Sequence, residues 1–359
     1  MRGVCFKKNL LKSPDLAHFL TSIEGSIFLL TDEKVASLYL SAFERYFSSY
    51  ALPLHSMIIK GGEASKSRET KSLIEDQMVS AKCDKDTLLI AFGGGVITDL
   101  GGFVAATFYR GIRYVSIPTT LLGMVDASIG GKTGINLPEG KNLIGAHYAP
   151  LSILIDSAFL KTLPENEFIS GTAEVIKYGL IANRGLIETL RKKRAHWMQR
   201  EQPLIEEILK MCVHLKLKIV KRDPLDRGKR RMLNFGHTIG HAIETLLNYK
   251  ISHGEAIAIG MVGEAKAALN LGLLSHQEFQ DLYDLVKEFA FSLKLSASVT
   301  SHRLLERMKK DKKAKGGELR IVLLKKVGKV EKNRGEYCAS IPERELQAAL
   351  NWMIEECRR

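Results

Sequence analysis

Three histidines give the sequence its clearest chemical signal. His237 and His241 are spaced i and i+4, so a helix over 234–248 places both on one face. His253 follows at the start of the next predicted helix. Catalytic zinc usually has three protein ligands and one open position. The three imidazoles could hold a metal together, or two could do so with a carboxylate and leave the third as a base. The metalloprotease motif HExxH is excluded, because Thr238 stands where its glutamate should be.

Glu174 is the best carboxylate for such a site. It lies in an apolar helical segment, where an unpaired buried carboxylate is costly. The alternative is that His237, His241 and His253 are core histidines bonded to the backbone. Spacing alone leaves both interpretations open.

A triple-glycine turn, Gly93–Gly95, follows the apolar run 87–92. Glycines after a strand let backbone N–H groups approach a phosphate, and the next helix N-terminus favours an anion. The order is not GxGxxG, so the ordinary Rossmann fingerprint is absent. A simple strand-to-helix turn is the alternative. Asp32, at the end of an earlier strand, could bond a ribose hydroxyl or cap a helix.

Several cations lie beside these motifs. Any single one could be a solvated surface charge. As a set they indicate a small polyanionic substrate; they are Lys132, Lys141, Lys177, Arg230, Lys312 and Lys313.

The elements that must position these residues fall into two halves. Short apolar runs at 26–31, 56–59, 87–92, 113–118 and 152–156 alternate with helical stretches, which indicates a parallel sheet covered on both faces. Beyond 159 the spacing becomes helical, and 319–324 is the one β-like run. The helical segments include 201–222, 234–248, 254–273, 276–290 and 342–357. We therefore predict an α/β domain over 1–160 with a parallel, dinucleotide-binding sheet, followed by a mostly α-helical domain over 161–359.

Composition agrees with two folded domains. The chain has 359 residues, 45% hydrophobic and 26% charged, which excludes a disordered protein. Five cysteines form no CxxC pair and no secretion signal is visible, so we expect free thiols and a cytoplasmic location. The net charge of +13 permits nucleic acid, a membrane surface or a small anion as partner. Aromatics do not interleave with the lysine runs, so we expect no nucleic-acid partner, and we expect no membrane partner either.

Taken together, these motifs resemble the 3-dehydroquinate synthase family of the sugar-phosphate cyclase superfamily. The resemblance runs from about Asp32 to Lys313 and is specific because of the joint order of its segments. They are GEASK (62–66), GGGVITDLGGF (93–103), PTT (118–120), VDASIGGKTGIN (125–136), GKNLIGA (140–146), TLP (162–164), AEVIKYGL (173–180), NFGHTIGHAIE (234–244), HGEAIAIGM (253–261) and DKK (311–313). One departure is 222–229, which lacks the family's acidic DExExG pattern.

The resemblance implies roles for individual residues. The metal is zinc or cobalt on Glu174, His237 and His253, with His241 as the general base. Arg110 reaches the neighbouring subunit's site, which implies a homodimer. Substrate contacts carry over to Asp126, Lys132, Asn142, Lys177, Lys216, Arg230, Asn234 and one of Lys312 and Lys313. NAD contacts carry over to Asp32, Glu63, Lys66, Gly94, Gly95, Val96, Asp99, Thr119, Thr120, Lys132, Lys141, Phe159, Leu160, Thr162 and Leu163.

The implied reaction converts 3-deoxy-D-arabino-heptulosonate 7-phosphate to 3-dehydroquinate and phosphate. It proceeds by transient oxidation at C5, phosphate elimination, reduction and intramolecular aldol closure. A cyclase acting on another sugar phosphate is one alternative. A metal-dependent alcohol dehydrogenase, which would release NADH, is another.

Overall fold

The computed structural model describes residues 3–23, 25–314, 318–332 and 335–358, and leaves the side chains of 311–314 undescribed. It divides into two compact units, Met1–Leu163 and Pro164–Arg359. Each unit is described by itself.

A six-stranded sheet forms the centre of the first unit. Its order is β1-β8-β5-β4-β2-β3, and every pair is parallel. The strands are β1 (Val4–Lys7), β2 (Ile27–Asp32), β3 (Leu54–Ile59), β4 (Leu88–Gly93), β5 (Arg113–Pro118) and β8 (Ser152–Asp156). The predicted parallel sheet is confirmed. The edge strand β1 was not predicted. None of its four residues is fully buried, and the apolar pattern of such a strand is weak.

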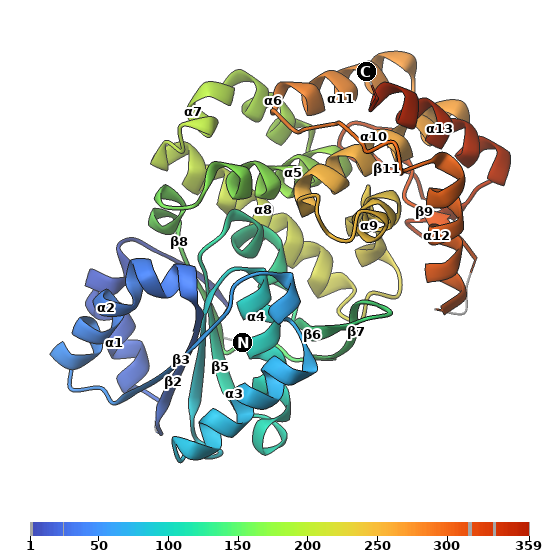
Figure 1. Ribbon diagram of the computed structural model, residues 1–359. Coiled ribbons are helices and arrows are strands. Elements are labelled where there is room, and N and C mark those ends of the chain that lie inside the picture. The colour runs from blue at the N-terminus through green and yellow to red at the C-terminus, as the bar shows by residue number, and fades with distance from the viewer. Residues whose placement is uncertain (1–2, 24, 315–317, 333–334, 359) are drawn as a thin grey trace. The chain divides into compact units, whose positions relative to one another are not determined.

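Helices cover both faces of this sheet. They are α1 (Pro14–Thr21), α2 (Glu33–Ser49), α3 (Arg68–Ser80) and α4 (Gly95–Thr107). Figure 1 shows α1 and α2 on one side of the strands and α3 and α4 on the other. Side chains of Ser13, Asp32 and Ser67 accept N–H bonds at the first turns of α1, α2 and α3, which satisfies donors that a helix start leaves open.

An antiparallel hairpin of β6 (Lys132–Leu137) and β7 (Gly140–His147) lies outside the sheet. The apolar pattern of the sequence did not predict this hairpin, which carries Lys132, Lys141 and Asn142. Glycine allows its strands to approach closely, since a Cβ on Gly145 would lie 2.0 Å from the Thr133 carbonyl oxygen. The pairing register shifts between Ile135 and Leu137.

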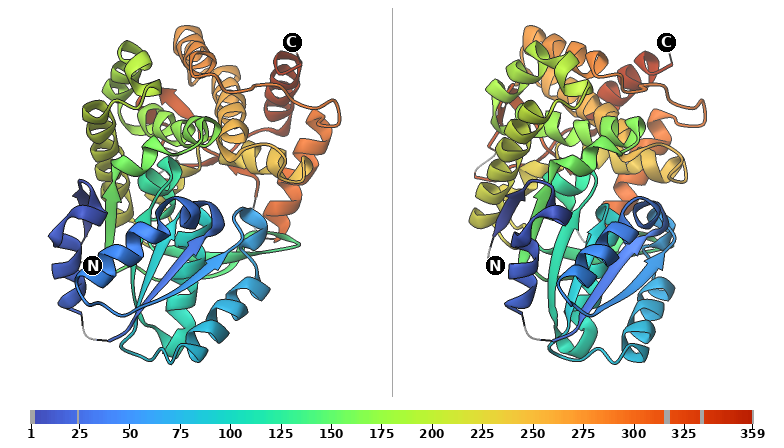
Figure 2. Two further views of the ribbon diagram at one scale, coloured as in Figure 1. Left: turned by 60° about the vertical axis from the view of Figure 1, so that its left-hand side comes forward. Right: turned by 90° about the vertical axis from the view of Figure 1, so that its left-hand side faces the viewer.

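The second unit is largely helical, as predicted. Its helices are α5 (Glu165–Ala182), α6 (Arg184–Lys192), α7 (Arg194–Met198), α8 (Gln202–Arg222), α9 (His237–Leu246), α10 (His253–Asn270), α11 (His276–Glu288), α12 (Ser301–Ala314) and α13 (Glu343–Glu356). Helix α10 packs against α5, α9, α11 and α13 and so forms the centre of this unit. Figure 2 shows α10 in light orange beside α5 in green.

Short strands complete the second unit. β9 (Arg320–Ile321) pairs with β12 (Ala339–Ser340), and β10 (Leu324–Lys326) pairs with β11 (Lys329–Val330). The predicted β-like run 319–324 therefore holds β9 and the first residue of β10. Among the described residues, no helix has both the length and the apolar character that crossing a membrane would demand.

Candidate active site

Three helices of the second unit bring Glu174, His237 and His253 together. Glu174 lies within α5, whereas His237 and His253 are the first residues of α9 and α10. The Glu174 Oε1 atom is 3.4 Å from His237 Nε2 and 3.7 Å from His253 Nε2. One ligand atom from each side chain lies within 4.8 Å of the other two. Two imidazole nitrogens and one carboxylate oxygen thus face a common point.

Glycines allow these helices to approach closely enough. A Cβ on Gly254 would lie 2.2 Å from the Ser170 carbonyl oxygen of α5, and one on Gly260 would lie 2.0 Å from the Gly236 carbonyl oxygen. Neither position tolerates a side chain. Ser252 and Glu255 form a capping box that starts α10 at His253. Close packing of the backbones therefore fixes the positions of His237 and His253 at the first turns of α9 and α10.

The two carboxylate oxygens of Glu174 have different neighbours. The side chain is fully buried, and Lys177 Nζ pairs with Oε2, which leaves Oε1 facing the imidazoles. Burial and the Lys177 cation lower the pKa of His237 to about 3, so this imidazole is neutral. Burial alone would lower the pKa of His253, but the hydrogen bonds that its ring donates to Glu174 and Glu244 outweigh burial and raise the pKa to about 9.

His241 differs from the other two histidines in its exposure. Its side chain is 50% exposed, against 13% for His237 and 25% for His253. The three rings are neighbours, with the His241 centroid 5.1 Å from that of His237 and 6.2 Å from that of His253. His241 is not part of the Glu174 group, and solvent reaches its ring. Its general-base role remains a prediction that this geometry allows.

Two buried glutamates beside the histidines were not assigned a role from the sequence. Glu244 is 2% exposed, and its Oε1 lies 3.4 Å from His253 Nδ1. Glu264 of α10 is fully buried, and its Oε1 accepts the Thr238 N–H at 3.3 Å. The signal that could have found Glu244 is its i+3 spacing from His241, at the end of the motif 234–244.

The predicted cationic substrate contacts of this unit are mostly buried. Lys177, Lys216 and Arg230 are each at most 5% exposed, so the solvated-surface alternative does not hold for these three. Asn234 is exposed at the end of the 3₁₀ segment η6 (Lys229–Asn234). Lys312 and Lys313 lie in α12, and their side chains are outside the described residues.

The loop before Arg230 is organised by Asp223, in the segment that departs from the family pattern. Its carboxylate accepts N–H bonds from Arg227, Gly228 and Arg230, the last at 2.9 Å. Burial would raise the pKa of Asp223, but these N–H groups hold it below its usual range. Asp223 thus provides an acidic anchor for the loop.

In the first unit the glycine turn leads directly into α4. Gly94 is the N-cap of α4, in extended conformation and without a capping side chain. A Cβ on Gly94 would lie 3.1 Å from the Thr120 methyl group, and one on Gly95 would lie 3.3 Å from Ala127 Cβ. Thr119 donates its N–H to the Gly93 carbonyl. The turn therefore packs against 119–127, and its N-cap residue, Gly94, gives the first turn of α4 no side-chain bond.

The other predicted cofactor contacts lie around the ends of the sheet strands. Asp32 accepts N–H bonds from Lys34 and Val35 at 3.0 Å, so it caps the N-terminus of α2, one of the two roles predicted for it. Its contact with a ribose hydroxyl stays a prediction. Thr162 bonds Tyr39 through their hydroxyls at 2.5 Å. Phe159 packs edge-on against Tyr39 and Phe92. Further predicted residues of this unit are Val96 in α4, Asp126 in the π-helical turn η4 (Gly123–Ala127), and Leu160 and Leu163 near the unit's end.

A polar cluster around the buried Lys66 joins further predicted residues, with Asn142 at its exposed side. Lys66 is 4% exposed, and its Nζ bonds Asp99 Oδ2 and, at 2.5 Å, Asn142 Oδ1. Glu63 Oε1 accepts a bond from Asn136 Nδ2 at 2.8 Å. The side chain of Asn142, a predicted substrate contact, is thus hydrogen-bonded to Lys66, a predicted NAD contact. Asn136 had no predicted role.

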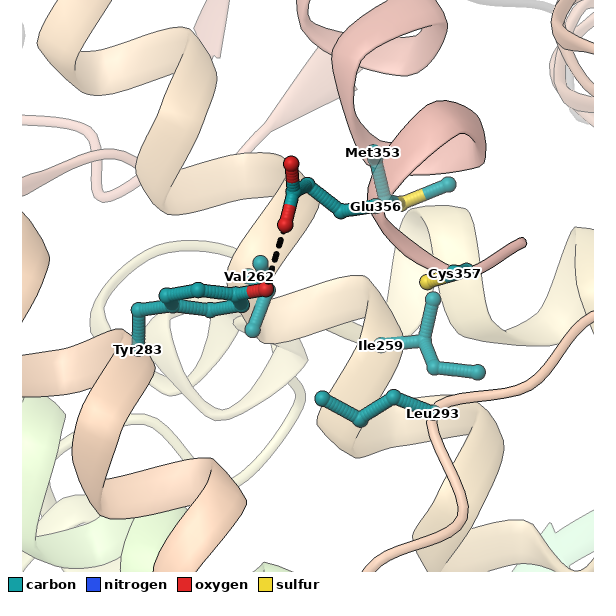
Figure 3. A pocket seen from close by; sticks show the side chains of 7 residues that line it. All are labelled: Ile259, Val262, Tyr283, Leu293, Met353, Glu356 and Cys357. Carbon is teal, nitrogen blue, oxygen red and sulfur yellow. Dashed lines mark hydrogen bonds between the residues drawn. The ribbon is translucent and has the colours of Figure 1, made fainter. Parts of the chain in front are cut away.

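A small cavity in the second unit lies among other residues. Its volume is about 10 Å³, room for one water molecule. Figure 3 shows its lining, which is Ile259, Val262, Tyr283, Leu293, Met353, Glu356 and Cys357. None of these is a predicted site residue, so the cavity takes no part in the site.

Comparison with known proteins agrees with this geometry. The N-terminal part of the 3-dehydroquinate synthase family matches residues 56–170, and the C-terminal part matches 171–314. A 3-dehydroquinate synthase from Crocosphaera subtropica is 39% identical over 336 residues, covering 91% of this chain and 92% of the relative. One from Acidithiobacillus ferrooxidans is 42% identical over 306 residues, covering 85% and 84%.

A solved structure of similar fold is ValA, a 2-epi-5-epi-valiolone synthase from Streptomyces hygroscopicus subsp. jinggangensis with NAD⁺ and Zn²⁺ bound. It is 28% identical with a TM-score of 0.90 and covers 98% of this chain and 96% of that one. The parallel-sheet unit, the helical unit and the Glu174 cluster define an enzyme of the sugar-phosphate cyclase superfamily. Within it, the chain belongs to the 3-dehydroquinate synthase family and is an enzyme with that family's activity.

Proposed function

We propose that the chain carries out the family's reaction with NAD bound by the first unit and one divalent metal bound by the second. The observation that carries this proposal is the convergence of Glu174 Oε1 with the Nε2 atoms of His237 and His253. Two imidazoles and a carboxylate are a donor set found in catalytic zinc sites. The domain assignment follows, with residues 1–160 for the cofactor and 161–359 for metal and substrate.

The donor set fits zinc or cobalt. Nitrogen and carboxylate oxygen donors suit both ions, and three protein ligands leave positions open for substrate. When bound, the metal would supply a Lewis acid for the substrate's C5 oxygen. Lys177, paired with the other oxygen of Glu174, orients that carboxylate. The metal in the ValA structure supports this assignment.

The first unit fits a dinucleotide. The N-terminus of α4, where the cap residue Gly94 has no side chain, offers backbone N–H groups to a pyrophosphate. Bound NAD would supply a hydride acceptor for the C5 alcohol and return the hydride within the same turnover. The NAD⁺ in the ValA structure supports this proposal.

The substrate's two anionic groups require cations. We assign the phosphate and carboxylate of 3-deoxy-D-arabino-heptulosonate 7-phosphate to the predicted substrate contacts. Buried Lys177, Lys216 and Arg230 hold charges that a bound anion would stabilise, and arginine suits phosphate oxygens through its planar fork. His241, whose ring is half exposed beside the metal ligands, moves protons during the reaction.

A homodimer completes the proposal. Tyr109 and Arg110 both have left-handed backbone conformations, with φ of 47° and 65°, and both side chains are exposed. Such backbone is costly for residues other than glycine and often marks functional positions. This geometry supports Arg110 as the residue that reaches a neighbouring subunit. The five free cysteines support a reducing, cytoplasmic location.

The decisive experiment is incubation with the heptulosonate phosphate, NAD and a divalent metal. We expect stoichiometric phosphate release, 3-dehydroquinate by NMR, and no lasting absorbance at 340 nm. Accumulating NADH would identify an alcohol dehydrogenase instead. Turnover only with a different sugar phosphate would identify another cyclase.

A further inference from the structure

Asn136 lies in β6, where the β6–β7 hairpin contacts residues 63–66, and its backbone N–H and both polar ends of its side chain make hydrogen bonds. Its backbone N–H donates to the Lys66 carbonyl at 2.7 Å. Its Nδ2 donates to Glu63 Oε1 at 2.8 Å, and its Oδ1 accepts the Asn142 N–H at 2.9 Å. One side chain thus joins Glu63, in the 3₁₀ turn η2 (Glu63–Ser65), to Asn142 on β7.

The irregular hairpin register explains why Asn136 can reach both sides. Ile135 pairs with Ile144, and Leu137 pairs with Gly140, so the register shifts at Asn136. A bulge frees the backbone N–H from the strand ladder and re-aims the side chain. That N–H bonds Lys66 in place of a β7 residue.

Lys66 and Asn142 close these contacts into a ring. Lys66 Nζ donates to Asn142 Oδ1 at 2.5 Å, and also to Asp99 Oδ2. Asn142 has a left-handed backbone, with φ of 54°. Its N–H and its side chain are therefore both held by residues from this cluster. A displacement of Glu63 or Lys66 must be transmitted to Asn142 through these bonds.

We propose that Asn136 is a positioning residue that couples the dinucleotide-contacting side chains of Glu63 and Lys66 to the conformation of the hairpin and its substrate-contacting Asn142. This inference rests on the proposed NAD site. The Asn136 side chain provides both a donor, for Glu63, and an acceptor, for the Asn142 N–H. Alanine removes both, whereas aspartate keeps the acceptor for Asn142 but places a second carboxylate against Glu63.

The test compares Asn136→Ala and Asn136→Asp with the intact enzyme in its metal-loaded form, without substrate. NAD affinity is measured by titration, and amide hydrogen exchange of residues 137–147 is measured with and without saturating NAD. Glu139→Gln, at the exposed tip of the same hairpin, is the matched control. For the intact enzyme and the control, we expect NAD to slow exchange in the hairpin.

For Asn136→Ala we expect about tenfold weaker NAD binding and a hairpin whose exchange no longer responds to saturating NAD. Asn136→Asp should weaken NAD binding at least as much, because of the repulsion from Glu63, while the basal exchange at Asn142 stays closer to that of the intact enzyme. A merely structural role would raise hairpin exchange equally with and without NAD.

The outcomes separate this inference from the proposed function. If the intact enzyme does not bind NAD, the proposed cofactor site is wrong, and the proposed coupling through Asn136 is wrong as well. If the intact enzyme binds NAD and both variants keep its affinity and the NAD-dependent protection of the hairpin, only the coupling is overturned. Should the alanine variant fail to fold, the aspartate variant still decides by its NAD affinity and hairpin response.

Discussion

The three histidines of the site are chemically alike, but we expect different roles for them because their surroundings differ. His253 and His237 face the Glu174 Oε1 atom, whereas His241 is half exposed outside that group. We expect His253→Ala to yield metal-free protein by elemental analysis. We expect His241→Ala to keep its metal and lose about 10²–10⁴-fold in turnover, the range of a well-placed general base. Stoichiometric metal loss in His241→Ala would contradict this division.

Glu244 illustrates how a residue outside the ligand set can matter. Its carboxylate faces His253 Nδ1 at 3.4 Å. When a metal displaces the proton from Nε2, which faces Glu174, this carboxylate keeps the remaining proton on Nδ1 and so orients the ring. Partners of this kind typically contribute 10–100-fold to metal affinity. We expect Glu244→Ala to weaken zinc binding by about that factor, measured by competition with a chelator, and Glu244→Gln to restore part of it.

A control for Glu244 is available on α6. Glu188→Ala removes a glutamate whose side chain is 69% exposed, and this substitution should leave the zinc affinity unchanged. A second metal equivalent that disappears in Glu244→Gln would mean that Glu244 is a ligand, not an orienting group.

At the scale of elements, helix α9 takes its N-terminal cap from another helix. Its own N-cap is Gly236, which has no side chain, with φ of 77°. Glu264 of α10 fills this role, since the N–H groups of Gly236, Thr238 and Ile239 all face its carboxylate. Burial outweighs these donors and raises the pKa of Glu264 to about 8. The position of His237 therefore depends on a side chain 27 residues away in the sequence.

The raised pKa predicts a pH-dependent stability. A folded-state pKa above the unfolded value means that the folded protein binds the extra proton. This contribution is complete below the usual pKa of glutamate, near 4.5, and is lost as the pH rises towards about 8. We expect urea unfolding to show the intact enzyme losing stability relative to Glu264→Gln between pH 5.5 and pH 9. A constant difference across that range would argue against a raised pKa.

At the scale of the whole molecule, each unit should respond to its own ligand. All predicted NAD contacts lie in Met1–Leu163, and the three predicted metal ligands lie in Pro164–Arg359. A ligand that binds only the folded state stabilises it by about 2.7 kcal/mol at 100 times its Kd. We expect amide exchange to slow chiefly in the first unit with NAD alone, and chiefly in the second with zinc alone. Protection by zinc centred on the first unit would contradict the assignment.

The sequence by itself determined the family, the parallel sheet and the helical second half. Continuous apolar strands such as 113–118 carry a local signal that needs no knowledge of their neighbours. Motif order identified the family, and the structure agrees that Glu174, His237 and His253 meet. Spacing alone had left the metal ligands open, because i and i+4 histidines share a face whether or not a carboxylate from another helix lies opposite.

Only the tertiary structure decided the supporting residues. The hairpin β6–β7 has a register shift and a weak apolar pattern, so its strands and the contacts of Asn136 were not visible locally. Glu244 and Glu264 gained their surroundings from helix packing, through glycine contacts at Gly254 and Gly260 that no periodicity reveals. The physical reason is that a side chain's chemistry is local, whereas its burial and its hydrogen-bond partners depend on segments that are distant in the chain.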